Sequence, residues 1–168
     1  MSDDIESSGF PQAVTRLRWL RGAYLDQVVV LEGVLDAYLF EYLAPPEAHR
    51  TLFYGVVLQR IGLNAKVQIM IDFVRDAGLA EEFGDIAVSL NAIVQFRNQC
   101  AHAHLQPKVS EDLWSAEEAS IVTWKKGELR TVPITQAEFE QRLDDVPKVF
   151  HRLWEFMCRV ATARETTE

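Results

Sequence analysis

The stretch IVQFRNQCAHAH, residues 93–104, combines helical apolar spacing with polar side chains that ordinary helix packing does not require. At about 100° per residue, one face of this helix collects the apolar residues Leu90, Ile93, Val94 and Ala101. Arg97 falls in the middle of that face, where a guanidinium is costly unless paired, because it cannot lose its charge. The stretch therefore predicts a bundle helix whose end has a function besides packing.

Three more polar residues gather around Arg97. Asn98 and His102 are four residues apart, so they share one flank of the helix, one turn from each other. His104 is expected on the other side of Arg97, as a helix-end residue that solvates the last carbonyl groups, and Pro107 ends the helix. The predicted cluster holds a cation, an amide and two imidazoles.

Helical spacing also precedes this stretch. Residues 13–43 predict one long helix closed by two prolines, and shorter helices are expected over residues 50–60 and 65–77. The apolar positions of the 50–60 helix are Leu52, Phe53, Val56 and Val57. The motif helix begins at Leu79 or after Gly84. Four helices thus lead up to and include the motif.

Charged residues mark the edges of these helices. The flank of the first helix carries Arg18, Arg21, Glu32 and Asp36. Since no histidine is near, a solvated or salt-bridged edge is favoured over a metal site. Lys66, at the start of the 65–77 helix, is expected to be solvated.

After the motif, the spacing of apolar residues no longer follows the helical pattern. Residues 119–125 and 128–132 are rich in β-branched and aromatic side chains and flank Lys126-Gly127, which predicts a β-hairpin. Thr135 and Glu138 then form a T-x-x-E capping box that starts a last helix. Pro147 lies inside that helix and is expected to kink or split it.

These elements predict a mainly α fold, an up-and-down bundle of four to five helices with a small β-hairpin, at about residues 119–133, inserted before the last helix. We expect a flexible leader over residues 1–12, a single domain over residues 13–163 and a frayed tail over residues 164–168.

Composition limits the functions open to the chain. A net charge of −8 has the wrong sign for non-specific nucleic-acid binding, so RNA must be met at a local basic cleft. Two cysteines cannot build a disulfide framework, which favours a reducing cytoplasm. No apolar run reaches membrane-spanning length, so no membrane partner is expected.

The string from Arg97 to His102 resembles the motif of the HEPN superfamily, R-x(4–6)-H in a small helical bundle, with Asn98 in the polar position after the arginine. The resemblance implies a metal-independent endoribonuclease without cofactor, acting as a homodimer through the motif helix. It also implies a toxin or defence setting, and an antitoxin or regulatory protein as partner. In the related toxins a tyrosine two residues after the histidine receives a nucleotide from the antitoxin; His104 stands there instead.

The residues support such chemistry on their own. Cleavage of RNA through its 2′-hydroxyl needs a base, an acid and positive charge on the phosphate. Histidine is the side chain suited to proton transfer near neutral pH, so His102 is the candidate base, with His102 of a second copy as the acid. Arg97 offers a fork of donors to phosphate oxygens, and Asn98 is the candidate that orients the histidine or the ribose.

Several alternatives stay open. The domain can bind a protein or nucleotide partner without catalysis, or serve as a structural adaptor in which Arg97 and His102 only hold the bundle together. The Arg97-Asn98 pair can also cap local carbonyl groups. His104 is a possible accessory residue for catalysis. Cys100 is expected to pack rather than react, and no metal site is predicted, since His102 and His104 lack further ligands.

Overall fold

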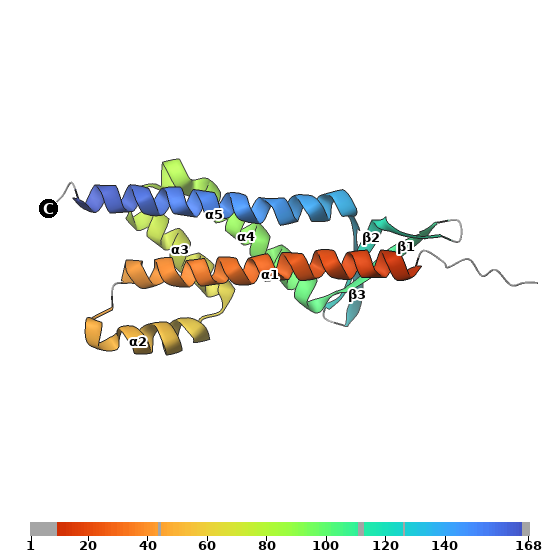
Figure 1. Ribbon diagram of the computed structural model, residues 1–168, viewed down its shortest axis with the longest axis horizontal. Helices are drawn as coiled ribbons and strands as arrows, with labels where there is room; N and C mark the ends of the chain where they lie inside the picture. The colour runs from red at the N-terminus through yellow and green to blue at the C-terminus, as the bar shows by residue number, and fades with distance from the viewer. Residues whose placement is uncertain (1–9, 44, 111–112, 126, 166–168) are drawn as a thin grey trace, which may run out of the picture. The chain divides into compact units, whose positions relative to one another are not determined.

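The protein is mainly helical, with a small antiparallel sheet before the last helix (Figure 1). The computed structural model describes residues 10–43, 45–110, 113–125 and 127–165. The elements in chain order are α1 (Phe10–Leu43), η1 (Glu47–His49), α2 (Arg50–Leu52), η2 (Phe53–Leu58), α3 (Leu63–Asp76), α4 (Ala80–His102), β1 (His104–Ser110), β2 (Leu113–Lys125), β3 (Glu128–Thr135) and α5 (Gln136–Glu165). The predicted fold class is confirmed.

Two compact units divide the contacts of the chain. Unit 1 takes residues up to Gln27 together with Phe96–Asp144, and unit 2 takes Val28–Gln95 together with the residues from Asp145 on. The described part of the chain begins in helix at Phe10, so three residues of the predicted leader are helical. The rest of that leader and the last three residues of the predicted tail lie outside the described residues, and the single domain stays a prediction.

The core of unit 2 is built from helical stripes with aromatic contacts at their centre. Its buried side chains at three- and four-residue steps include Leu31, Leu35 and Leu39 of α1, Val67, Met70 and Phe73 of α3, Ile86 and Leu90 of α4, and Val149, Leu153 and Phe156 of α5. The Phe156 ring meets Phe73 edge-on at 4.9 Å and Phe83 at 5.5 Å between centroids. Aromatic pairs of this geometry stabilise beyond their buried area.

Lys66 is buried in unit 2, so the prediction that it is solvated was wrong. It retains 2% of its exposed surface, and its Nζ lies 2.9 Å from Glu32 Oε1 and 2.7 Å from Asp36 Oδ1. Both carboxylates come from α1, one turn apart, where a salt-bridged edge was expected. The edge is salt-bridged as expected, but the cation comes from α3. Because an unpaired charge at this buried position would be very costly, the pairing is obligatory.

Residues 50–60 are helical, as predicted, but the segment between α1 and α3 is irregular. It is a 3-10 turn, one α-turn and a π-helical stretch in succession, η1, α2 and η2. Of the predicted apolar positions, Leu52, Val56 and Val57 are exposed, and Leu58 is the buried residue of η2. The π-helical turn shifts the side chains around the axis, because it places more residues in a turn than the 3.6-residue spacing assumes.

The sheet of unit 1 has three strands, where a hairpin of two was predicted. The hairpin itself is confirmed: β2 and β3 pair antiparallel, and Gly127 lies at its turn with φ of +83°. The unexpected strand is β1, which pairs with β2 from His104 opposite Val122, with a bulge between Pro107 and Lys108. Pro107 therefore lies in a strand instead of ending a helix, as the bulge permits.

The capping box at the start of α5 is formed as predicted. The Thr135 backbone N–H donates to Glu138 Oε2 at 2.8 Å, and the Glu138 backbone N–H donates to Thr135 Oγ1 at 3.1 Å. These reciprocal bonds satisfy two donors at the helix start. Pro147 does not split the helix, which runs continuously to Glu165.

Replacing Lys66 tests the buried cluster. We expect Lys66→Met to lower the free energy of unfolding by about 3–5 kcal/mol, since it keeps the side-chain length but leaves the buried Asp36 carboxylate and the partly buried Glu32 carboxylate without their cation. Lys148→Met is the matched control, because the Lys148–Asp145 pair, 2.8 Å long, is exposed; it should cost less than about 1 kcal/mol. Urea denaturation measures both, and equal losses would contradict an obligatory pairing.

The same cluster should make the free energy of unfolding depend on pH in the alkaline range. Burial lowers the pKa of Lys66, but hydrogen bonding and charge attraction from Asp36 and Glu32 together outweigh it and raise that pKa above its ordinary value of 10.5. The folded state then holds the proton more tightly, so this stabilisation is complete below pH 10.5 and is lost as pH rises through the raised pKa. Above pH 10.5 the free energy of unfolding should fall more steeply for the parent than for Lys66→Met; parallel slopes in urea titrations would exclude this contribution.

Candidate functional site

An aromatic cluster in unit 1 holds the motif end of α4. Phe96 is 6% exposed, and its ring meets Tyr24 of α1 edge-on at 4.8 Å and Phe139 of α5 at 5.0 Å between centroids. Tyr24 and Phe139 also meet each other edge-on at 6.4 Å. Three elements therefore fix the rotation of this helix end, because turning it would remove Phe96 from both rings.

Arg97 lies at the edge of the buried face of α4, half-buried, and not in its middle as predicted. The buried side chains on this last part of the helix are Phe96 and Cys100, one turn apart, with Ala103 following directly after the helix. Ala101, assigned to the apolar face, is half-buried. Burial of the large apolar Phe96 ring is more favourable in free energy than burial of the Arg97 guanidinium. The core therefore forms on the side of the helix that carries Phe96.

Asn98 and His102 are exposed, as their flank position predicts. Arg97 Nη1 donates a hydrogen bond to Asn98 Oδ1 at 3.3 Å, so the guanidinium and the amide face each other at the surface. His102 follows Asn98 by one turn on the same helix and is its last residue. The structure thus joins Arg97 to Asn98 by a hydrogen bond and places His102 one turn beyond Asn98 on the exposed flank of α4, with Arg97 at the edge of the buried face.

His104 is separated from these three residues by the end of the helix. The helix stops at His102, the Ala103 backbone N–H closes its last turn on Gln99 at 2.9 Å, and His104 opens β1. Its predicted role as a helix-end residue was therefore wrong: it is an exposed strand residue, paired with Val122. The motif continues from helix into sheet at this point.

Arg21 of α1 reaches the end of the motif helix and was not among the predicted site residues. Its Nη2 donates to the Ala101 carbonyl oxygen at 3.3 Å. That carbonyl belongs to the last turn of α4, where carbonyls lack helical partners and positive charge is favourable. Arg21 thus provides the carbonyl contact that the Arg97-Asn98 pair could have made. The sequence signal was its position among the charged residues on the flank of the first helix.

Cys100 is a packing residue. It is fully buried, and burial raises the pKa of its thiol to about 12, against the opposing influence of the Arg21 charge. The thiolate needed for nucleophilic attack is therefore almost absent at neutral pH. Cys158 is exposed.

No family model, curated protein or solved structure matches the chain. Across the part of the chain that the structure describes, no three histidine, cysteine, aspartate or glutamate side chains are grouped to hold a metal ion. The helices described there include none that is both long and apolar enough to cross a membrane.

Thiol labelling tests the assignment of Cys100. In the native protein at pH 8, a reagent that reacts with thiolates should modify only one of the two cysteines, Cys158, because Cys100 is buried and its pKa is about 12. Unfolding in urea should release the second thiol. Cys158→Ser is the control, and rapid native labelling of that variant would show an accessible, reactive Cys100.

Proposed function

We propose that this protein is a HEPN-like endoribonuclease that cleaves RNA without a metal ion and acts as a homodimer. The observation that carries the proposal is the hydrogen bond between Arg97 and Asn98 at the end of α4, with the exposed His102 one turn beyond Asn98. Arg97 and Asn98 face each other, and the aromatic cluster around Phe96 fixes the helix end that bears all three. A guanidinium, an amide and an imidazole at one helix end are the kinds of group that phosphodiester chemistry requires.

The roles follow from the reaction. His102 takes the proton of the ribose 2′-hydroxyl, whose oxygen attacks the adjacent phosphorus. Arg97 donates to the phosphate oxygens as their negative charge grows, since its planar fork matches them. The bond to the 5′-oxygen breaks, that oxygen leaves with a proton, and the upstream strand ends in a 2′,3′-cyclic phosphate. Asn98, next to the guanidinium, orients it or the ribose.

The second proton transfer is the reason for a dimer. One imidazole that has just accepted a proton on one side of the phosphate is poorly placed to protonate the leaving oxygen on the other. His102 of a second copy would supply that acid in a symmetric cleft. Arg97 is half-buried at the edge of the apolar face, so its burial alone gives no argument for a dimer. The dimer therefore rests on the chemistry and on the resemblance.

The biological setting follows from the same resemblance. We place the protein in the cytoplasm as a toxin or defence effector restrained by an antitoxin or regulatory protein. His104 stands where related toxins carry the modified tyrosine, and it lies in β1. Restraint by nucleotide attachment at that position is therefore not part of the proposal. His104 is kept as an accessory imidazole.

RNA cleavage tests the proposal directly. The parent should cut single-stranded RNA in excess EDTA and leave 2′,3′-cyclic phosphate ends. Arg97→Ala and His102→Ala should each lower the rate by roughly 100-fold or more, since charge stabilisation and proton transfer are of that size. The rate constants come from single-turnover assays on a labelled oligonucleotide, and light scattering gives the oligomeric state.

His151→Ala is the matched control, because His151 is an exposed helical imidazole paired with Glu155 at 3.2 Å in unit 2. It should cleave like the parent, and Asn98→Ala should be intermediate. Unchanged cleavage by the Arg97 and His102 variants would refute the assignment. A melting temperature several degrees lower for Arg97→Ala would instead indicate a structural arginine.

A further inference from the structure

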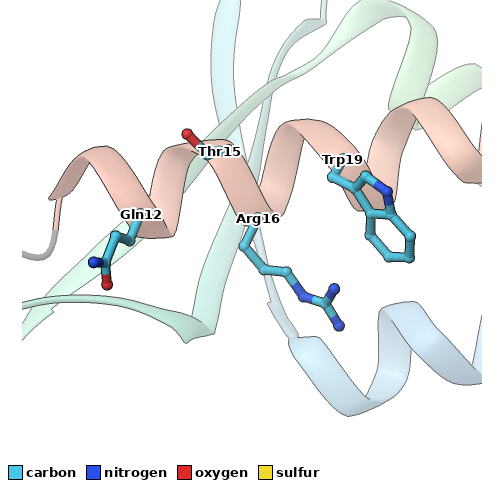
Figure 2. Close-up of a pocket in the computed structure, with 4 residues that line it drawn as sticks. All are labelled: Gln12, Thr15, Arg16 and Trp19. Carbon is cyan, nitrogen blue, oxygen red and sulfur yellow. The ribbon is translucent and has the colours of Figure 1, made fainter.

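A pocket on α1 lies outside the group formed by Arg97, Asn98 and His102. Its volume is about 510 Å³, and it is lined by Gln12, Thr15, Arg16 and Trp19, all in unit 1. Pockets that hold small ligands measure roughly 300–1,000 Å³. In Figure 2 the side chains of Gln12, Arg16 and Trp19 project from the same side of α1, and the Thr15 hydroxyl projects from the other. The spacing of these three residues, four and then three, places them in one stripe along the helix.

Trp19 is the most unusual member of this stripe. It is 55% exposed, although Leu17 and Leu20 beside it in the sequence are buried. An indole carries a large apolar surface, and tryptophan is enriched at interfaces where one part of its ring stays in contact with water. The ring therefore provides a flat stacking surface at the mouth of the pocket.

Arg16 is fixed in place beside this ring. Its guanidinium carbon lies 4.7 Å from the Trp19 ring centroid, and its Nη2 lies 2.5 Å from Glu140 Oε1 of α5. Glu140 also accepts a hydrogen bond from Gln136 at 2.7 Å. The wall of the pocket is thus held by a cation–π contact and a charge-assisted hydrogen bond, so little order must be gained on binding.

The charges of the pocket indicate what it selects. Glu140 balances the charge of Arg16, so a phosphate or carboxylate would meet a guanidinium already paired with an anion. The Arg16 guanidinium covers one face of the indole, and the 55% exposure of Trp19 leaves surface on which a flat, uncharged ring can stack. The Gln12 amide is exposed and offers both a donor and an acceptor, the pair of groups that a nucleobase edge requires.

We propose that this pocket binds a nucleobase, stacked on Trp19 and hydrogen-bonded at its edge by Gln12. The base can come from a free nucleotide or from a single-stranded RNA, since both present the same ring. The proposal does not depend on RNA cleavage, because no residue of the motif takes part in it. If the protein does cleave RNA, the pocket is a second contact that positions the strand.

Binding measurements in the His102→Ala background keep RNA intact and separate this proposal from catalysis. The probes are a fluorescent single-stranded RNA decamer, its abasic counterpart and ribonucleoside monophosphates as competitors, measured by anisotropy. We expect the decamer to bind and the abasic strand to bind far more weakly. Trp19→Ala should weaken binding of the decamer roughly tenfold, as loss of one stacked base predicts, and Trp19→Phe should restore most of it.

Trp154→Ala is the matched control, because Trp154 is a helical tryptophan of similar exposure, 60%, in unit 2. It should bind the decamer like the parent. Competition by monophosphates would identify a site for free nucleotides, and lack of competition would identify a site for an RNA strand. Both outcomes support binding of a nucleobase in the pocket. No binding by either probe, equal binding of the abasic strand, or equal losses in the Trp19→Ala and Trp154→Ala variants would overturn the proposal. Circular dichroism confirms that each variant is folded.

Discussion

Burial of Phe96 between Tyr24 and Phe139 is the interaction on which the candidate site depends. These rings come from α4, α1 and α5, and each meets the other two edge-on. Because Arg97 follows Phe96 directly, an inward Phe96 places the guanidinium at the rim of the buried face and turns Asn98 outward. His102, one turn after Asn98, then shares its exposed side. The apolar core thus decides where the polar groups of the motif are presented.

The sequence was informative wherever a local pattern decides the structure. Spacing of three and four residues placed α1, α3, α4 and α5, and the reciprocal bonds of Thr135 and Glu138 followed from a four-residue signature. Strand β1 was missed because its histidine, glutamine, lysine and proline give it no strand pattern of its own. It forms because β2 offers a partner edge, and that is a tertiary cause.

The details of the site were harder to predict for related reasons. Helical angles alone put Arg97 in the middle of the buried face and did not assign Phe96 to it, whereas the contacts of Phe96 with Tyr24 and Phe139 turn the buried side toward Phe96. The contact between Arg21 and the Ala101 carbonyl joins residues 80 positions apart, so no local sequence pattern predicts it. The pair Asn98 and His102 was placed correctly, because a four-residue spacing on an exposed flank depends on the helix alone.

The buried Lys66 has a consequence for the chemical reactivity of the protein. It is one of five lysines, and two carboxylates and near-complete burial keep its amine from solution. Acylating reagents and trypsin reach such a side chain only when α1 and α3 separate within unit 2, so modification at this one position reports local opening. The rate of modification at Lys66 therefore measures how often α1 and α3 separate.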